Sequence, residues 1–395
     1  MNIHLLTSEV QDYINAHLHD DAGKIALSKS PFANVSSAEL ANQIAAKRKS
    51  RKKLPTWFNT TGICYPPLLS IEQCSSETTA TFKAQLAIGE SLLDLTGGFG
   101  VDSYYFSKNV GRVLHCEINP ELSAIASHNS GVLQRSNVDF MAADGMRYLQ
   151  ESSSSFDTIY LDPARRSSSG KVFMLKDCVP DVTTHLDLLL ARSSRLIIKT
   201  APLLDLSAGL AELKKVSSIY IVSVKNECKE LLWVMDKQRT EGLQIHSIML
   251  NNPHKHFSFA WGEERIEAAL LEAEIATGEY LYEPDAAVLK SGAFNLIGDR
   301  YGIVKLHQQS QLFWSRTANT DFPGRIFKVE RVLKATELKK EKDLSGNVIT
   351  RNYPERADNL LKKHRIKPDD KRFLIFTKTT TTGYTVFDTT ILQHY

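Results

Sequence analysis

Between residues 91 and 162 the chain alternates short apolar segments with helical stretches, and a carboxylate closes each of four apolar segments. These carboxylates are Asp94, Glu117, Asp144 and Asp162. Strands that alternate with helices need crossover connections, so they form a parallel sheet. The carboxyl ends of such strands share one edge of the sheet, where ligands bind. The sequence therefore predicts a ligand site at which these four side chains gather.

The predicted sheet continues beyond residue 162. A further apolar strand, RLIIK, ends at Lys199, and two later strands are joined by the short segment KNECK at residues 225–229. A connection of that length fits only an antiparallel hairpin. The prediction is an α/β fold with a Rossmann-like sheet, parallel except for one antiparallel hairpin strand.

Helices precede this sheet and a small α+β module follows it. Leu6, Val10, Ile14 and Leu18 recur at helical spacing, and residues 36–39 resemble a capping box that opens a second helix. After about residue 240 strands dominate, with helices predicted at 286–298 and 355–364. The predicted C-terminal strands are 302–306, 311–315, 326–333, 372–378 and 384–390.

The strand-to-helix turn after Asp94 is rich in glycine. Gly97, Gly98 and Gly100 follow an apolar strand, and glycine lets a backbone approach a ligand closely. A dinucleotide fingerprint that starts at Gly98 would also need glycine at position 103, which is Ser103. We interpret the turn as a nucleotide-cofactor loop. The alternative is a tight turn that binds no ligand.

The spacing of the next acids supports a cofactor. Glu117 lies 23 residues after Asp94, where a carboxylate can accept hydrogen bonds from both ribose hydroxyls. Asp144 is placed to accept a hydrogen bond from an adenine amino group. Each acid alone is more often a helix cap or a turn residue. Four consecutive strands with acidic ends favour cofactor binding.

This stretch resembles a class I S-adenosylmethionine-dependent methyltransferase. Asp94, Gly98 and Gly100 match the first motif of that class, Glu117 matches its ribose-binding acid, and Asp144 matches its adenine-side acid. The resemblance implies S-adenosylmethionine as the cofactor. It also adds four neighbouring residues to the cofactor site: Thr96, Gly97, Ile118 and Gly145.

A fuller resemblance runs from about residue 40 to the end. The strings EQCSSETTATFKA, DLTGGFGVDS, YLDPARR, VKNECKELLWV and DFPGR are similar to those of bacterial class I methyltransferases with a ferredoxin-like insert and a C-terminal THUMP-like domain. The resemblance implies an N-terminal helical region, a methyltransferase domain, a ferredoxin-like region and a basic THUMP-like domain. Their expected boundaries, in that order, are 1–62, 63–262, 263–321 and 322–395.

The residues after the fourth strand depart from a known pattern. Asp162 and Pro163 stand where amino-group methyltransferases carry Asp-Pro-Pro-Tyr, but Ala164 and Arg165 replace the last two residues. By this resemblance Asp162 and the Pro163 carbonyl would orient an acceptor amine. Arg165 would stack on a base or clamp a phosphate; the alternative is a surface salt bridge. Phe173 and Tyr160 are further candidates for an aromatic that stacks on a base.

Other polar residues near the sheet have two interpretations each. Ser75 and Ser76 could bind the methionine carboxylate of the cofactor, or they could cap the helix at 77–87. Asp102 could face the methionine ammonium group, or it could complement a helix dipole. Lys199 could face a substrate phosphate, or it could end a solvated strand.

The charge distribution favours a polyanionic partner. Net charge is only +3, but residues 323–395 carry 16 Lys and Arg against 9 Asp and Glu, and residues 41–60 carry six cations and no acid. Basic segments bind nucleic acids because they release condensed counterions. The alternative is a solvated helix face and a Lys-rich loop. THUMP-like domains resemble RNA-binding modules, so RNA, either rRNA or tRNA, is the expected partner.

Several classes of protein are not expected. The chain has no run of 18 apolar residues and no secretory signal pattern, so neither a membrane span nor export is predicted. Its 5 cysteines form no C-x-x-C pair, which favours a reducing cytoplasm over a disulfide framework. The 12 histidines show no metal-binding spacing, so no metal site is predicted.

We therefore expect an S-adenosylmethionine-dependent methyltransferase that methylates an RNA nucleotide, with an exocyclic amine as the favoured acceptor. Two alternatives stay open: a methyltransferase with a non-RNA substrate, and a catalytically silent module that binds RNA or cofactor. A nicotinamide oxidoreductase is disfavoured by Ser103 and by the strand hairpin. The sequence leaves open the nucleotide, the methylated atom and the oligomeric state.

Overall fold

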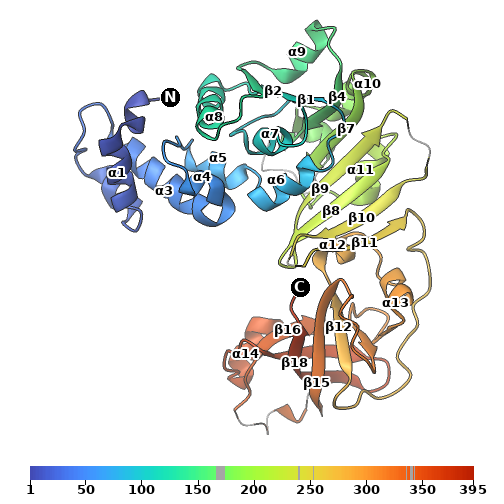
Figure 1. The fold of residues 1–395 in the computed structure, drawn as a ribbon. Helices are drawn as coiled ribbons and strands as arrows, with labels where there is room; N and C mark the ends of the chain where they lie inside the picture. Colours follow the sequence, from blue (N-terminus) through green and yellow to red (C-terminus); the bar gives the residue numbers. More distant parts are fainter. Residues whose placement is uncertain (166–173, 239–240, 252, 335, 339–340, 342) are drawn as a thin grey trace. The chain divides into compact units, whose positions relative to one another are not determined.

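A computed structural model describes residues 1–165, 174–238, 241–251, 253–334, 336–338, 341 and 343–395. The chain divides into two compact units (Figure 1). The first unit contains Met1–Ser217 and Leu232–Thr240, and the second contains Ser218–Leu231 and Glu241–Tyr395. No described helix is both long enough and apolar enough to cross a membrane.

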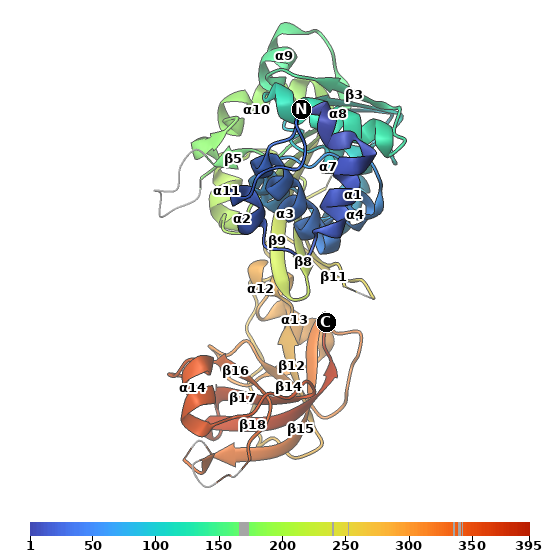
Figure 2. The ribbon, with the colours of Figure 1, turned by 90° about the vertical axis from the view of Figure 1, so that its left-hand side faces the viewer.

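The first unit opens with helices, as predicted. Residues Ser36 and Glu39 form the expected capping box at the start of the longest of them. Trp57 of α4 packs edge-on against Tyr104 of α7, with ring centroids 4.9 Å apart, so these helices lie against the sheet domain (Figure 2). The N-terminal elements are η1 (Ile3–Leu6), α1 (Ser8–Ala16), α2 (Ala22–Leu27), α3 (Ser37–Lys53), α4 (Pro55–Asn59), α5 (Leu68–Gln73) and α6 (Glu77–Ala84).

The sheet of the first unit is built by strand–helix alternation. Its parallel strands are β1 (Ser91–Asp94), β2 (Arg112–Cys116), β3 (Val138–Met141), β4 (Phe156–Leu161) and β7 (Ser193–Thr200). Within this unit the strand order is β9-β7-β4-β1-β2-β3. The crossover helices are α7 (Val101–Phe106), α8 (Pro120–Val132), α9 (Gly145–Glu151), α10 (Val182–Ala191) and α11 (Leu206–Glu212). Three short elements lie between β4 and α10: β5 (Ala164–Arg165), η2 (Leu175–Asp177) and β6 (Cys178–Val179).

The predicted hairpin is present. Strands β8 (Ser218–Val224) and β9 (Glu227–Asp236) are joined by Lys225 and Asn226 alone. Both residues have positive φ, 52° and 60°, as a tight two-residue hairpin turn requires. The boundary between the two units falls within β9. The predicted fold class is confirmed.

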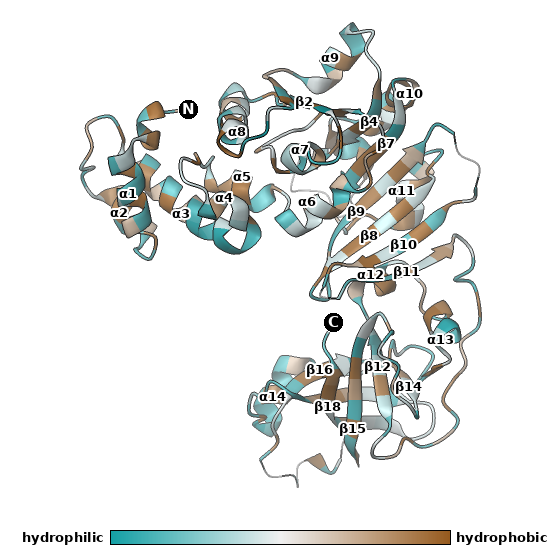
Figure 3. Ribbon diagram, in the orientation of Figure 1, coloured by the Kyte–Doolittle hydropathy of each residue, from teal (hydrophilic) through white to brown (hydrophobic). Residues whose placement is uncertain are grey.

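Two further strands of the second unit lie beside the hairpin. Strand β10 (Gln244–Met249) pairs with β8 in parallel, and β11 (Lys255–Ala260) pairs with β10 antiparallel. Apolar residues recur along β8, β9 and β10 (Figure 3). Helix α12 (Ala286–Lys290) contacts both β8 and β10, so it covers one face of this part of the sheet.

The rest of the second unit is a sheet in the order β13-β14-β12-β15-β18-β17-β16. Alternate residues of β17 enter two cores: Phe373 and Ile375 belong to one cluster, and Leu374 and Phe376 belong to the other. The remaining elements are β12 (Tyr280–Pro284), α13 (Leu296–Tyr301), β13 (Val304–Lys305), β14 (Phe313–Ser315), β15 (Gly324–Lys334), β16 (Asn347–Arg351), α14 (Ala357–His364), β17 (Arg372–Thr379) and β18 (Gly383–Gln393).

One predicted element is wrong. Residues 286–298 are not one helix, because α12 ends at Lys290 and α13 begins only at Leu296. Gly292 has φ of 81°, which breaks the helix, and the Ser291 hydroxyl accepts a hydrogen bond from the Ala293 backbone N–H. Strands β10, β11, β12 and β16 were not predicted individually.

Candidate functional site

The glycine turn after β1 is shaped by residues of the neighbouring strand β2. The Gly97 N–H donates to the Cys116 carbonyl at 2.8 Å, and a Cβ atom on Gly97 would lie 2.1 Å from Cε1 of His115. Gly98 and Gly100 have φ of 55° and 82°, which favours glycine at both. The close approach to β2 explains why the turn needs glycine even before any ligand is considered.

Asp94 ends β1 and is almost completely buried beneath this turn. Its carboxylate accepts hydrogen bonds from the Ser103 hydroxyl at 2.6 Å and from the Thr96 N–H at 3.1 Å. Burial raises the pKa of Asp94 to about 7. Burial also lowers the pKa of His115, whose Nδ1 lies 3.1 Å from the Ser103 hydroxyl, to about 3. Asp94 therefore stabilises the glycine turn through hydrogen bonds to residues on both sides of it.

Glu117 follows β2 and is half-buried. One carboxylate oxygen accepts the Gly98 N–H at 2.9 Å, and the other accepts the Asn119 N–H at 2.8 Å. Each oxygen keeps a lone pair for another donor. The next residue, Ile118, is 72% exposed, which is unusual for so large an apolar side chain. The structure thus places a fixed carboxylate and an open apolar surface next to the glycine turn.

Asp144 follows β3 and caps α9. Its carboxylate accepts hydrogen bonds from the N–H groups of Met146 at 2.9 Å and Arg147 at 3.3 Å. Gly145 is buried, and a Cβ atom there would lie 2.8 Å from the Leu95 carbonyl oxygen. Asp144 therefore caps α9, and the close contact of Gly145 with Leu95 holds it beside the turn that follows β1.

Asp102 lies in a buried polar cluster. Its Oδ2 accepts hydrogen bonds from Ser75 at 2.8 Å and Tyr160 at 2.9 Å, and its Oδ1 lies 3.3 Å from Nζ of Lys83. Lys83 is fully buried and also donates to Ser75. Burial alone would raise the pKa of Asp102. The charges of Lys83 and Lys199 and the hydroxyl groups of Ser75 and Tyr160 outweigh this effect and lower the pKa. Ser76 caps α6 by accepting the Thr79 N–H at 3.2 Å.

Asp162 follows β4 and is tied to two other elements. Its N–H donates to the Thr96 hydroxyl at 2.7 Å, and its carboxylate forms an ion pair with Lys199 at the end of β7. Both side chains keep contact with solvent, 33% for Asp162 and 14% for Lys199. Asp162 therefore lies at an accessible position with its carboxylate already paired with a cation.

The other residues of this motif have different positions. Pro163 is buried, and Tyr160 is 1% exposed, so the Tyr160 ring is closed to a base. Arg165 lies in β5, but its side chain lies outside the part of the chain that the structure describes. Phe173 also lies outside the described residues.

Sequence analysis missed the roles of Lys83 and Lys53 and left the role of Lys199 open. Lys83 pairs with Asp102, and Lys199 pairs with Asp162 instead of ending a solvated strand. A third lysine, Lys53 at the end of α3, donates to the carbonyls of Ile71 and Glu72, and burial lowers its pKa. Charged residues on helices are usually solvated, so no sequence signal distinguished Lys83 and Lys53.

The described residues fit a nucleoside cofactor. A turn with two positive-φ glycines, the Glu117 carboxylate with lone pairs left for further donors, and the exposed Ile118 lie at the ends of β1 and β2. Together they provide close backbone approach, hydroxyl acceptors and an apolar surface for a ring. Both oxygens of Asp94 accept hydrogen bonds from the protein, whereas Asp102 accepts them from the described residues only through Oδ2, and its buried Oδ1 faces Nζ of Lys83. Among the residues described, no group of three or more His, Cys, Asp or Glu side chains could hold a metal ion.

Comparison with known proteins agrees with this geometry. Residues 280–323 match a family model of a ferredoxin-like domain, and residues 324–387 match one described as THUMP domain-like. A crystal structure of a candidate methyltransferase from Porphyromonas gingivalis W83 superimposes on this chain with a TM-score of 0.86 at 28% sequence identity. The match covers 99% of this chain and 98% of the P. gingivalis chain.

Curated relatives match a smaller part of the chain. An uncharacterized S-adenosylmethionine-dependent methyltransferase of Mycobacterium tuberculosis H37Rv is 22% identical over 240 residues, which is 61% of this chain and 63% of the relative. An uncharacterized RNA methyltransferase of Mycoplasma mobile is 29% identical over 170 residues, which is 39% of this chain and 46% of the relative. The chain thus matches less than two thirds of the length of either relative.

Proposed function

We propose that this chain, which belongs to the class I S-adenosylmethionine-dependent methyltransferases with a ferredoxin-like and a THUMP-like domain, methylates an RNA nucleotide. The observation that carries the proposal is the arrangement at the carboxyl edge of the sheet. There the glycine turn, Glu117 after β2 and Asp144 after β3 surround one region, and Asp162 follows the adjacent strand β4. The relatives named as methyltransferases and the P. gingivalis structure support the same activity. The boundaries 1–62, 63–262, 263–321 and 322–395 remain our proposed domain limits.

The cofactor site is proposed at the ends of β1, β2 and β3. S-adenosylmethionine supplies an electrophilic methyl group when it is bound. Glu117 would accept hydrogen bonds from the ribose hydroxyls through its remaining lone pairs. Ile118 would contact the adenine ring, and Asp144 would lie near the adenine amino group. Gly98 and Gly100 would allow close backbone approach. Ser75 and Asp102, tied to Lys83, would border the methionine end.

The acceptor site is proposed at Asp162. Transfer is an in-line displacement, so the protein mainly positions the acceptor against the methyl group. In the favoured version Asp162 and the Pro163 carbonyl would orient an exocyclic amine. The proton would leave the nitrogen as the new N–C bond forms, and Asp162 would be its first acceptor. Arg165, by its place in the chain, would contact the RNA near this point.

The ion pair between Asp162 and Lys199 supports a second candidate, a hydroxyl acceptor. A lysine ammonium beside the acceptor disfavours the positive charge that develops on a methylated amine, but it stabilises oxygen as a hydroxyl loses its proton. In this version Asp162 would accept the hydroxyl proton while the O–C bond forms. The nucleoside product distinguishes the two versions directly.

RNA is proposed as the substrate on two grounds. The basic segment 323–395 lies in the THUMP-like part of the chain, and the Mycoplasma mobile relative is named as an RNA methyltransferase. Ribosomal and transfer RNA are the expected classes, and the cytoplasm is the proposed compartment.

The test is methyl transfer from isotope-labelled S-adenosylmethionine to RNA purified from a strain that lacks the gene, followed by nucleoside mass spectrometry. A labelled base amine supports the amine version, and a labelled ribose supports the hydroxyl version. Asp162→Asn should abolish labelling and leave cofactor affinity intact. Label in protein or small molecules but not in RNA would contradict the RNA proposal.

Calorimetry tests the cofactor separately. S-adenosylmethionine and NAD are titrated into the wild type, Asp94→Ala and Glu117→Ala. Micromolar S-adenosylmethionine binding that weakens in Glu117→Ala supports the proposed site. Binding of NAD instead would overturn it. Tight cofactor binding with no transfer to any acceptor would favour the silent binding module.

A further inference from the structure

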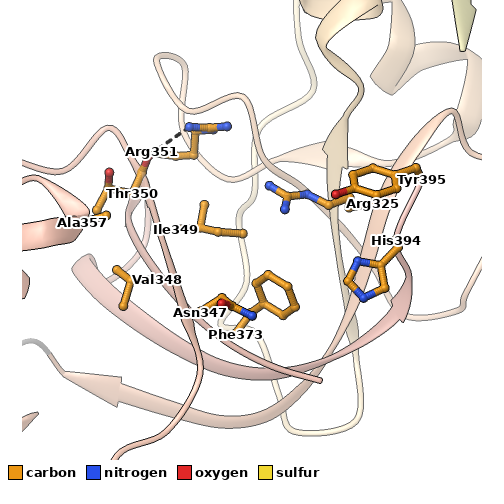
Figure 4. A pocket seen from close by; sticks show the side chains of 10 residues that line it. All are labelled: Arg325, Asn347, Val348, Ile349, Thr350, Arg351, Ala357, Phe373, His394 and Tyr395. Carbon is orange, nitrogen blue, oxygen red and sulfur yellow. Dashed lines mark hydrogen bonds between the residues drawn. The ribbon is translucent and has the colours of Figure 1, made fainter. Parts of the chain in front are cut away.

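A polar cavity lies in the C-terminal sheet of the second unit. It has a volume of about 520 Å³ and is lined by β16, by Arg325 of β15, by Phe373 of β17, and by His394 and Tyr395 after β18 (Figure 4). Small-molecule sites typically measure about 300–1,000 Å³, so the cavity has room for one nucleotide. No part of the methyltransferase chemistry discussed above uses it.

Two arginines are held at this cavity by one buried acid. Glu283 of β12 is fully buried; its Oε2 accepts a hydrogen bond from Nε of Arg325 at 2.6 Å, and its Oε1 lies 2.6 Å from Nη2 of Arg351. Figure 4 shows both guanidinium groups on the same side of the cavity, above Ile349 and Phe373. A carboxylate between two cations fixes their side chains, so little conformational entropy would be lost when a ligand binds.

These guanidinium groups keep donors for a ligand. Each has five N–H donors, and Arg351 uses a further one on the Thr350 carbonyl at 3.2 Å. Among the described residues, none accepts from Nη1 of Arg325 or Nε of Arg351. No acidic side chain is among the residues that line the cavity. Paired guanidinium groups of this kind bind phosphate through several hydrogen bonds.

Aromatic rings complete the cavity. The His394 ring lies 6.0 Å from the Phe373 ring and 5.7 Å from the Tyr395 ring, measured between centroids. Phe373 is buried in the core, whereas Tyr395 is 36% exposed and His394 is exposed. Exposed aromatic rings next to arginines form stacking surfaces for unpaired bases. A phosphate site and a base-stacking surface therefore border the same cavity.

We propose that this cavity binds a single unpaired nucleotide, with its phosphate on Arg325 and Arg351 and its base against His394 and Tyr395. The proposal deepens the proposed function and rests on it for the identity of the ligand, because that nucleotide would belong to the RNA substrate. It makes the cavity a recognition site distinct from the carboxyl edge of the first sheet.

The test uses cytidine 5′-monophosphate as the probe and the full-length protein saturated with S-adenosylhomocysteine, which keeps the nucleotide out of the cofactor site. Affinity is measured by ligand-detected NMR for the wild type, Arg351→Gln and Tyr395→Ala. Lys334→Gln, at the far end of β15, is the matched control because it removes the same charge from an exposed side chain outside the cavity. Arg351 is 38% exposed, and Glu283 keeps Arg325 as a partner, so Arg351→Gln should still fold; a circular dichroism spectrum and a cooperative thermal unfolding transition like those of the wild type check this.

We expect Arg351→Gln to weaken cytidine monophosphate binding at least tenfold, Tyr395→Ala to weaken it several-fold, and Lys334→Gln to leave it unchanged. Equal affinity of the wild type and Arg351→Gln, or no binding to the wild type, would overturn the proposal. So would inorganic phosphate that binds as tightly as the nucleotide. The RNA methylation assay is independent of this test. Methyl transfer to RNA without nucleotide binding at this cavity would contradict only the proposal of a nucleotide site. Nucleotide binding at this cavity without methyl transfer to RNA would contradict only the proposed function.

Discussion

At the residue scale, three acids of the candidate site are held by side chains from other elements. Lys199 of β7 pairs with Asp162, and Lys83 of α6 pairs with Asp102. Asp94 instead accepts from the Ser103 hydroxyl of α7. The charge and orientation of these carboxylates therefore depend on the packing of the whole sheet domain.

Removal of Lys83 tests this dependence. Lys83→Met would leave Asp102, whose side chain is 12% exposed, without its cation. Loss of one partner from a buried ion pair typically costs about 3–5 kcal/mol in the free energy of unfolding. We expect a loss of this size in urea unfolding.

The double variant Lys83→Met/Asp102→Asn serves as the control, because it removes both charges. It should recover more than half of the lost stability. Lys214→Met, at an exposed position, should leave stability within about 0.5 kcal/mol of the wild type. A double variant as unstable as Lys83→Met would contradict the ion-pair interpretation.

The raised pKa of Asp94 predicts a pH-dependent stability. The folded protein keeps the carboxyl proton up to about pH 7, whereas the unfolded chain releases it near pH 4. The stability that this group contributes is therefore present below about pH 4 and lost as the pH rises from 4 to 7. One proton changes the free energy of unfolding by about 1.4 kcal/mol per pH unit.

Asp94→Asn should not show this loss, because its side chain stays neutral. The unfolding free energy of the variant minus that of the wild type should rise between pH 4.5 and pH 7 and level off above pH 7. Urea titrations at four pH values measure it. His115, whose pKa is lowered to about 3, is present in both proteins and largely cancels in the difference. A constant difference would show that Asp94 titrates normally.

The acids of the site could be predicted from the sequence, but their partners could not. Each acid follows an apolar strand, and parallel strands bring their carboxyl ends to one edge. Lys83 lies in an ordinary helical segment, and only the packing of α6 on α7 buries it. The chemical roles of Asp162, Glu117 and Asp144 stay predictions, because position alone does not test them.

At the scale of elements, the glycine turn is set by its contact with β2. Gly97→Ala would place Cβ 2.1 Å from the His115 ring, so the turn or the ring must move. We expect a loss of about 1–3 kcal/mol in unfolding free energy and at least tenfold weaker S-adenosylmethionine binding in calorimetry.

Gly131→Ala in α8 is the matched control, since no atom beyond its chain neighbours and the backbone of its own helix lies within 4 Å of its Cβ position. Alanine favours a helix over glycine, so this variant should be neutral or slightly more stable. If Gly97→Ala binds the cofactor as the control does, the turn is not part of the cofactor site.

Element prediction succeeded where spacing was regular and failed where one residue changed the backbone. The alternation from β1 to β7 and the capping box of α3 have strong local signals. The segment 286–298 has a helical composition, but Gly292 adopts a left-handed conformation and divides it into α12 and α13.

At the scale of the whole molecule, the composition locates the basic regions, but it does not show which of their cations are free to contact an RNA backbone. Lys47, Arg48, Lys49 and Lys53 of α3 all bond to other parts of the chain, so most of this basic run is already used within the fold. In the described C-terminal region, Lys362 and Lys371 are exposed and no described residue binds their ammonium groups. The C-terminal surface is therefore the better candidate for contact with a phosphate backbone.

This difference predicts the salt dependence of RNA binding. The logarithm of the affinity should fall linearly with the logarithm of the salt concentration, with a slope of about 0.7 per phosphate contact on single-stranded RNA. Lys362→Gln/Lys371→Gln should reduce the slope by about 1 to 1.5, whereas Lys52→Gln on α3 should leave it unchanged. Fluorescence anisotropy at several KCl concentrations measures all three proteins. A slope that changes with Lys52→Gln and not with the C-terminal pair would place the RNA on α3 instead, and a flat salt dependence in the wild type would count against RNA as the partner.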